Sequence, residues 1–413
     1  MASGAWAPGR GTRAPPLWHV GGVWQVAGGA TIGRLPAPIT WGMHRLAAPF
    51  ALAVPLLLAA CLPIAAPPSV YDEPFPVVAV ELPRDDAGHP APIEWWYWVG
   101  HLEDADGRRL AFQLTFFKAY APPQLRILGL PANLWFEKGH VAHAAVVDLD
   151  AGEHVMRQRI DFLYEADASY ADLDVFVGPS WGAMRADDGV GHALRATVGG
   201  YQLDLVATPV KPAALHGDPP GIQSMGAGGV SYYTAHTRMA VTGTVRGPCL
   251  MPAACRAVPA TGQAWFDHQW GDFRIDRFAG WDWFALQLDD GADVMLYLIR
   301  DFDGAIASAA GSYVAADGRV VALGPEDFEL RATGPTWTSP RTGATYPAAW
   351  RVTVPAFGVD VEVTPMVADQ EMDTRATTGI VYWEGAVAVR GSHGGVGFVE
   401  LTNYDRAPRE TGR

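Results

Sequence analysis

The most constraining feature of this sequence is a stretch at residues 263–289 that packs aromatic and acidic side chains into two strand-like runs. The runs are 263–270 and 280–289, and the polar segment GDFRIDRFA lies between them. Successive side chains of a strand point to opposite faces. One face of the second run therefore carries an acid on an apolar stripe, which consists of Asp282, Phe284, Leu286 and Leu288. The other face carries Trp281, Trp283, Ala285 and Gln287.

The first run separates its acid from its histidine in the same way. His268 shares a face with Phe266 and Trp270. Asp267 shares the opposite face with Trp265 and Gln269. Burying an acid on an apolar strand face costs free energy unless the acid is paired or protonated. This stretch is therefore the first place to search for function.

The rest of the chain repeats the pattern of short strands separated by turn residues. Runs such as 94–100, 109–117 and 293–301 are rich in β-branched and aromatic residues, and no long stretch keeps a helical period. The turns Asp289-Asp290-Gly291 and Ala316-Asp317-Gly318 are typical of hairpins. This spacing predicts an all-β sandwich or barrel. Each half has enough strands for one barrel, with a boundary near residue 256.

Composition limits the classes of partner. A hydrophobic content of 49% with 18% charged residues describes a folded chain, and 413 residues are enough for two domains. The formal net charge is −14, and the sequence contains no basic run. These two facts argue against nucleic acid as a partner.

The N-terminal region predicts export and lipid anchoring. Met43, two polar residues and an apolar run to Ala60 have the anatomy of a secretory signal peptide. The run ends in LAAC, which resembles a bacterial lipobox and predicts lipidation at Cys61. The alternatives are an ordinary signal peptide and a membrane helix, although the run is shorter than the roughly 20 residues of a span.

These features predict an order of segments. Residues 1–42 precede a complete signal peptide, so we expect a misassigned start or disorder there, followed by the signal peptide at 43–60. The Pro- and Ala-rich segment 61–76 reads as a tether to the folded part. The predicted location is the periplasmic face of a bacterial membrane.

Two further cysteines and several histidines raise the question of a metal. Cys249 and Cys255 are close enough in sequence for a disulfide-closed loop in an exported protein. A metal site is the competing interpretation, but no histidine lies at ligand spacing. His140 and His143 lack a third ligand nearby in the sequence, and His101 stands apart. We therefore predict no metal. The serine-hydrolase elbow, the HExxH motif and the P-loop are also missing.

Several motifs together resemble one family. They are EWWYWVGHL at 94–102, LAFQLTFFK at 110–118, AWFDHQWGDF at 264–273, GWDWFALQLDDG at 280–291, YWEGAVAVRG at 382–391 and GFVELTNY at 397–404. They are similar to the AttH-like family, which includes carotenoid 1,2-hydratase (hydroxyneurosporene synthase), and the resemblance covers roughly residues 75–405. It implies an all-β fold of two lipocalin-like antiparallel β-barrel domains packed side by side. We place these domains at 77–256 and 257–408.

The resemblance implies hydration of a carbon–carbon double bond without a cofactor. Such a step needs a protonated acid, a way to stabilise a cation and a positioned water molecule. We predict Asp282 as the acid and His268 as a base or water-orienting group, with Asp267 fixing the histidine ring. Aromatic faces stabilise cations. The substrate-binding candidates are Trp270, Trp281, Trp283, Tyr232, Tyr233, Glu94 and Trp96.

Each candidate also has a structural interpretation. Asp282 can bond backbone N–H groups at a bulge, and His268 can be a satisfied core histidine. Glu94 opens a strand of consecutive aromatic residues and can be a structural acid at a barrel mouth. Glu384 and Glu400 can be buried hydrogen-bond acceptors. The tryptophans can be fillers of a barrel core.

Three functions remain open from the sequence. The first is a hydro-lyase that acts on an apolar isoprenoid. The second is a non-catalytic, lipid-anchored periplasmic protein that carries an apolar small molecule or lipid. The third is a secreted hydrolase with an unrecognised site. A lipobox places the protein outside the membrane face where carotenoid hydration normally occurs, which weighs against a literal carotenoid hydratase.

Overall fold

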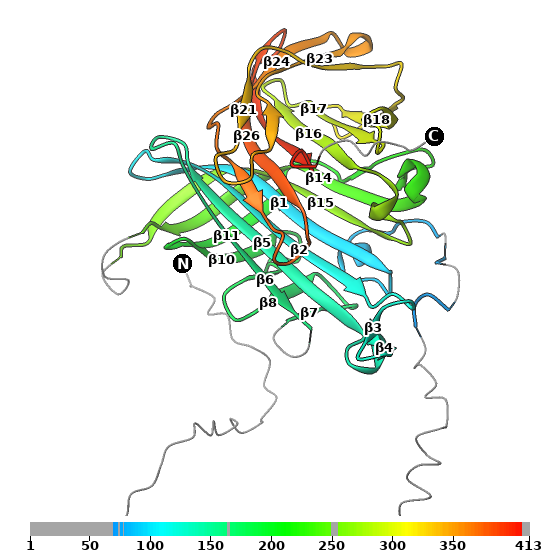
Figure 1. Ribbon diagram of the computed structural model, residues 1–413. Coiled ribbons are helices and arrows are strands. Elements are labelled where there is room, and N and C mark those ends of the chain that lie inside the picture. Colours follow the sequence, from blue (N-terminus) through cyan, green and yellow to red (C-terminus); the bar gives the residue numbers. More distant parts are fainter. Residues whose placement is uncertain (1–68, 73–74, 77, 163–165, 249–254, 407–413) are drawn as a thin grey trace, which may run out of the picture. The chain divides into compact units, whose positions relative to one another are not determined.

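The computed structural model describes residues 69–72, 75–76, 78–162, 166–248 and 255–406 (Figure 1). All of them belong to the compact unit Ala65–Arg413. The predicted signal peptide, the segment 1–42, Cys61 and Cys249 lie outside the described residues. Within the described ranges, no helix combines the length and apolar character that a membrane crossing requires.

The first sheet contains thirteen strands, all paired antiparallel, and curls into a nearly closed barrel. Its continuous path runs β6-β5-β2-β1-β15-β14-β11-β10-β9-β8-β7, while β12 and β13 pair with β14 off this path. The longest strands form its centre: β1 (Ile93–Asp104), β2 (Arg109–Tyr120), β5 (Lys138–Asp148), β14 (Val230–Arg246) and β15 (Val258–Gly271). The others are β6 (Glu153–Asp161), β7 (Ala166–Ala168), β8 (Asp174–Val177), β9 (Gly182–Arg185), β10 (His192–Val198), β11 (Tyr201–Pro209), β12 (Ala214–Leu215) and β13 (Ile222–Ser224).

The second sheet contains ten strands and forms a half-barrel. Its path runs β19-β18-β17-β16-β27-β26-β24-β23-β20, and β25 pairs with β26. The central strands are β16 (Gly280–Leu288), β17 (Asp293–Arg300), β26 (Val381–Gly391) and β27 (Gly395–Thr402). The others are β18 (Ile306–Val314), β19 (Val320–Leu323), β20 (Glu329–Ala332), β23 (Trp350–Val354), β24 (Val359–Pro365) and β25 (Glu371–Asp373).

Short elements complete the structure. Two separate hairpins pair β3 (Arg126–Ile127) with β4 (Leu130–Pro131) and β21 (Thr336–Thr338) with β22 (Thr345–Pro347). The described 3-10 helices are η1 (Arg84–Asp86), η2 (Ala132–Leu134), η3 (Gly226–Gly228), η5 (Ile275–Arg277) and η6 (Pro355–Phe357). The predicted all-β fold with two antiparallel barrel-like sheets is therefore confirmed.

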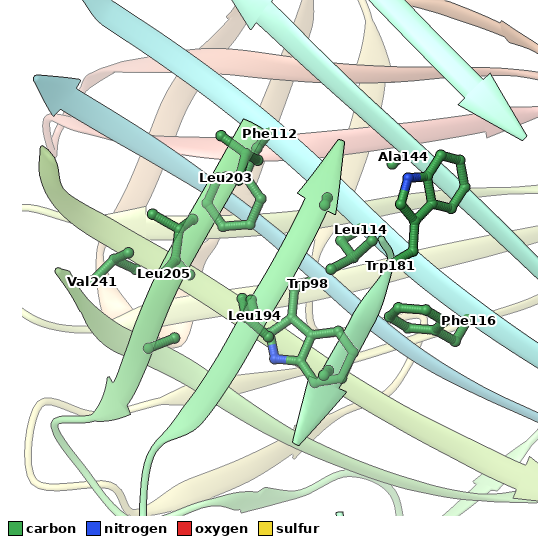
Figure 2. Packing of buried hydrophobic residues seen from close by; sticks show 14 of the residues in the cluster. Trp98, Phe112, Leu114, Phe116, Ala144, Trp181, Leu194, Leu203, Leu205 and Val241 are labelled. Atoms are coloured by element: carbon green, nitrogen blue, oxygen red, sulfur yellow. The ribbon is translucent and has the colours of Figure 1, made fainter. Parts of the chain in front are cut away.

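Strand alternation places most of the buried apolar side chains of the described residues in three large cores. The interior of the first sheet holds large rings and aliphatic side chains from opposite walls, including Trp98, Phe112 and Leu203 (Figure 2). The interior of the second sheet holds Phe284 and Leu286, as the alternation predicted. A third core joins the outward faces of the two sheets and includes residues from both, namely Tyr97, Val99, Tyr233, Trp265, Trp283, Ala285, Ala386 and Phe398.

The division between the sheets lies later than the sequence indicated. We expected a boundary near residue 256, but β15 pairs with β1 and β14 as a central strand of the first sheet. The second sheet begins with β16 at Gly280. The strand 263–270 therefore belongs to the first sheet, because both of its pairing partners, β1 and β14, precede residue 256.

Candidate functional site

The most unusual set of polar residues lies in the core between the two sheets. Tyr97 of β1 is directly opposite Asp267 of β15, so both side chains share the outward face of the first sheet. On the second sheet, Glu384 of β26 and Trp283 of β16 are both directly opposite Glu400 of β27. Strand register thus brings three carboxyl groups into one core that is otherwise aromatic and aliphatic.

The side chain of Glu384, on the second sheet, is linked to the first sheet by one hydrogen bond. The hydroxyl of Tyr97 donates to its Oε1 over 2.6 Å. Its Oε2 is buried and has no hydrogen-bond partner within the described structure, and the residue is only 2% exposed. Burial raises the pKa of Glu384 well above its usual range, and the negative charge of Glu400 raises it further. Both effects favour the neutral carboxylic acid, and its Oε2 remains without a hydrogen-bond partner within the described structure.

Glu400 is a second carboxyl group with a shifted pKa. The indole Nε1 of Trp281 donates to its Oε2 over 2.9 Å. Burial raises the pKa of Glu400 to about 7, and the nearby Asp282 carboxylate acts in the same direction. Glu400 remains partly accessible to solvent. It can therefore exchange protons near neutral pH, which suits a general base.

Asp267 is the third carboxyl group of this core, and it is held by two donors. Trp265 Nε1 donates to Oδ1 over 2.6 Å, and the Tyr233 hydroxyl donates to Oδ2. Trp283 Nε1 in turn donates to the Tyr233 oxygen over 2.9 Å. Burial raises the pKa of Asp267 to about 7 despite these bonds. Three of the predicted residues, Asp267, Tyr233 and Trp283, therefore form one network.

A second polar group flanks this network. Tyr382 of β26 receives a hydrogen bond from Gln113 Nε2 over 3.3 Å, and His143 Nδ1 lies 2.9 Å from the same hydroxyl. Burial lowers the pKa of His143 to about 3, so this ring is neutral. Gln113 Oε1 is buried without a partner within the described structure. An acceptor is therefore available on the first sheet, close to the β26 strand that carries Glu384.

A cavity of about 730 Å³ opens at one end of the contact between the sheets. Its lining comes from both sheets and includes His101, Leu102, Gln263, Met366 and Val396. His101 and Gln263 are directly opposite each other on the outward face that also carries Tyr97. Such a volume suits a small ligand. The cavity therefore shares with Tyr97 the outward face of β1.

His268 lies elsewhere, inside the first sheet. Its Nε2 is 2.9 Å from Glu94 Oε1, and its ring stacks on Trp96 with centroids 4.8 Å apart. His89 Nδ1 also contacts Glu94 Oε1 at 2.7 Å, and Lys118 Nζ lies 2.5 Å from Glu94 Oε2. Glu94, Trp96 and His268, all predicted as site residues, therefore form a buried ionic cluster apart from Asp267.

The charges of this cluster compensate one another. Burial by itself would raise the pKa of Glu94, but hydrogen bonds from His268 and His89 and the charge of Lys118 hold it well below its usual range. Burial lowers the pKa of Lys118, against the attraction of Glu94. Both side chains are fully buried. The carboxylate therefore serves as the counter-ion of a buried lysine, which favours the structural interpretation of Glu94.

Asp282 lies inside the second sheet, and both of its oxygens are occupied. Arg300 Nε donates to Oδ1 over 3.2 Å, and the Tyr404 hydroxyl donates to Oδ2 over 2.9 Å. The predicted role of Asp282 as the acid is therefore not supported, because the carboxyl group has no free oxygen and faces away from the core between the sheets. The partners are side chains rather than the backbone groups that we considered.

The remaining predicted residues take separate positions. Trp270 stacks on Tyr232 and on His89 at the edge of the ionic cluster. The Tyr232 hydroxyl donates to the Pro76 carbonyl over 3.0 Å, so it fastens the N-terminal segment. Cys255 is disulfide-bonded, whereas its predicted partner Cys249 lies outside the described residues.

Two groups of side chains inside the first sheet have the composition of metal sites: His89, Glu94 and His268, and Asp86, His192 and His236. Glu94 in the first group is already neutralised by Lys118. In the second group, Trp98 Nε1 donates to His192 Nδ1 over 3.1 Å. A neutral His192 then carries its proton on Nε2, the atom that would have to bind the metal. Arg185 also pairs with Asp86 at 2.8 Å. Neither group therefore favours a cation in this state.

Three residues of this core, Glu384, Glu400 and Tyr97, are not among the site residues that the sequence predicts. Glu384 and Glu400 have only the structural interpretation of buried hydrogen-bond acceptors, and Tyr97 lies within the aromatic run that follows Glu94. The signal that could have found them is the alternation of their strands. Glu384 and Ala386 share one face of β26, and Phe398 and Glu400 share one face of β27. Both strands therefore place an acid on an apolar stripe, as in β16.

Comparisons with known proteins agree with this architecture. The family model described as AttH-like matches residues 73–404. The crystal structure of an AttH protein from Nitrosomonas europaea is 32% identical, with a TM-score of 0.69, and the match covers 80% of this chain and 99% of that one. Kievitone hydratase from Nectria haematococca shares the fold at 16% identity and a TM-score of 0.62, over 80% of this chain and 94% of that one. A search of curated protein sequences finds no match. The chain belongs to the AttH-like family.

Proposed function

We propose that this protein is a cofactor-free hydratase that adds water to a carbon–carbon double bond of an apolar substrate in the core between the two sheets. The observation that carries the proposal is Glu384. It is a buried carboxyl group with a strongly raised pKa, and one of its oxygens has no partner within the described structure. A neutral carboxylic acid in an apolar site can protonate an alkene.

The first step is proton transfer from Glu384 Oε2 to one carbon of the double bond. The Tyr97 hydroxyl, which donates to Oε1, stabilises the carboxylate that forms. The carbocation left on the other carbon needs nearby electron density. Aromatic faces supply roughly 0.5–2 kcal/mol each. Trp283 packs edge-to-face against Tyr97 with centroids 5.3 Å apart and edge-to-face against Trp265 at 6.1 Å.

The second step is addition of water to the cation. Glu400 can take the proton that the water molecule loses, because its pKa of about 7 leaves a substantial carboxylate fraction at neutral pH. Glu400 lies directly opposite Glu384 in the strand register. In one turnover Glu384 loses its proton to the substrate and Glu400 gains one from water. Transfer of a proton from Glu400 back to Glu384 restores the starting state. Water supplies every atom that is added, and no oxidant or reductant is needed.

The fold and the family support this reaction class. The chain shares its architecture with kievitone hydratase and belongs to the AttH-like family. The site is lined by aromatic and aliphatic residues of both sheets, which suits an apolar, alkene-containing substrate of the isoprenoid class. Asp267, with a pKa of about 7, adds a charge that varies with pH beside the two glutamates.

A carrier without chemistry is the second candidate, and the cavity between the sheets favours it. Its volume of about 730 Å³ is sufficient for a small apolar ligand, and its lining contains Leu102, Leu110, Leu149 and Met366. None of the three carboxyl groups with raised pKa lines this cavity. A ligand could therefore be held there without contacting an acid.

Mass spectrometry of organic extracts distinguishes a hydratase from a carrier without chemistry. Full-length protein would be incubated with acyclic carotenoids, other isoprenoids and kievitone, with wild type and Glu384→Gln run in parallel. Hydration predicts a product heavier by one water from wild type and a loss of about 10²–10⁴-fold in Glu384→Gln. Asp282→Asn is the matched control, since it also replaces one buried carboxyl group by an amide.

The outcomes are distinct. Recovery of the same unchanged ligand from wild type and Glu384→Gln would establish a carrier and overturn the hydratase. Equal product from wild type and Glu384→Gln would show that another group supplies the proton. Circular dichroism of each variant checks that the protein is folded before activity is compared.

A further inference from the structure

An exposed apolar surface surrounds the connection between β2 and β5. Thirteen large hydrophobic side chains are exposed in the described residues, and six of them lie in two short segments next to each other. We call this set the apolar loop surface; it consists of Leu125, Leu128, Leu134, Trp135, Ile160 and Phe162. Phe136 packs on Phe162 with ring centroids 4.7 Å apart, which joins the two segments. Exposed apolar groups that cluster in this way mark interaction sites.

The tip of this surface is held outward by its backbone. β3 and β4 are joined by Leu128 and Gly129, which both have positive φ, at +52° and +82°. Hairpin turns of this kind favour Gly, Asn or Asp at such positions. Leu128 is instead 87% exposed at the turn. A leucine that is strained and unburied contributes nothing to the folded core, so an external contact explains it better.

The start of the described chain lies at the base of the same surface. The Tyr71 hydroxyl donates to the carbonyl of Tyr120 over 3.3 Å. Tyr120 is the last residue of β2, immediately before the loop that carries β3 and β4 (Figure 1). Cys61, the predicted lipidation site, precedes Tyr71 by ten residues. Ten extended residues span at most about 35 Å. A lipid on Cys61 would therefore keep a membrane within reach of this end of the barrel.

We propose that the apolar loop surface inserts into the outer layer of the bilayer that holds the Cys61 lipid. Tryptophan at such a surface suits the membrane interface, and Trp135 is 48% exposed. The net charge of −14 opposes attraction to anionic lipids. The contact is therefore apolar, and the partner is a neutral bilayer surface. The proposal rests on the predicted lipid anchor and is independent of the proposed catalysis.

Quenching by brominated lipid tests the insertion. The full chain carrying Leu128→Cys, labelled with an environment-sensitive dye, would be reconstituted into phosphatidylcholine vesicles with and without brominated acyl chains. The matched control is Ile306→Cys, a 51% exposed position on the second sheet. Protein without an added cysteine gives the background from the native cysteines. We expect at least threefold stronger quenching at position 128 than at position 306.

A second variant separates insertion from proximity. Leu134→Ser and Trp135→Ser together remove two apolar contacts of the same surface without touching the dye or Cys61. Insertion predicts that quenching at position 128 falls to the level at position 306. Quenching that is equal at the two positions from the start, or that persists unchanged after both serine substitutions, would overturn the proposal.

Discussion

The hydroxyl of Tyr97 and the carboxyl group of Glu384 join the two sheets through a hydrogen bond of 2.6 Å between residues 287 positions apart in the chain. The phenol donates, so Oε1 is occupied while Oε2 stays without a partner within the described structure. This arrangement orients the carboxyl group and leaves Oε2 for the proposed proton transfer.

Tyr97→Phe tests whether the phenol positions and tunes Glu384. The hydrogen bond from Tyr97 favours the ionised form of the glutamate, so its removal raises the pKa of Glu384. A weaker acid protonates the alkene more slowly. We expect roughly a tenfold loss of kcat, corresponding to about 1.4 kcal/mol, together with a shift of the alkaline limb of the pH–rate profile to higher pH. A loss of rate with an unchanged profile would assign Tyr97 a structural role alone.

The raised pKa of Asp267 predicts a contribution to stability that falls as the pH rises. Asp267 has a pKa of about 7 in the folded protein, above its value of about 3.9 in an unfolded chain. The folded state therefore binds more protons than the unfolded state between these values. The stabilisation is fully present below about pH 4 and is lost as the pH rises to about 7, at up to about 1.4 kcal/mol per pH unit.

Denaturant unfolding of wild type and Asp267→Asn at several pH values measures this contribution. The difference in unfolding free energy between the two proteins isolates Asp267 from the other titrating groups. We expect the variant to gain stability relative to wild type as the pH rises from about 4 to 7. A difference that is constant over this range would mean that Asp267 is ionised in the folded state throughout.

Asp282→Asn is predicted to lower the unfolding free energy of the protein rather than its catalytic rate. The substitution removes the carboxylate that Arg300 and Tyr404 bind inside the second sheet. We expect the unfolding free energy to fall by about 1–3 kcal/mol, because one buried charged hydrogen bond is weakened. Activity per folded molecule should remain within a few-fold of wild type. A loss comparable to that of Glu384→Gln would restore Asp282 as the acid.

Glu94→Gln should destabilise the protein, because it leaves Lys118 in the ionic cluster of the first sheet without its counter-ion. Lys118 is fully buried, and Glu94 is its partner at 2.5 Å. Leaving a buried charge without its partner costs about 3–5 kcal/mol. The double variant Glu94→Gln with Lys118→Met removes the charge as well and should recover part of that loss. Thermal and denaturant unfolding measure both effects, and equal destabilisation in the single and double variants would contradict the pairing.

Much of the fold was determined by the sequence itself. The period-two alternation in 280–289 predicted which side chains share a face, and β16 places Phe284 and Leu286 inside the second sheet with Trp283 and Ala285 outside it. This works because face assignment depends only on strand geometry, which is local. The same reasoning correctly separated His268 from Asp267.

Only the tertiary structure decided which faces meet. Asp267, His268 and Asp282 are close in sequence but lie in three environments: between the sheets, inside the first and inside the second. Glu384 becomes the candidate acid because it meets Tyr97 from a distant strand. A pKa depends on burial and on neighbouring charges, and both are set by contacts between residues far apart in the chain. Alternation along one strand fixes the direction of a side chain, whereas the packing of two sheets fixes its chemistry.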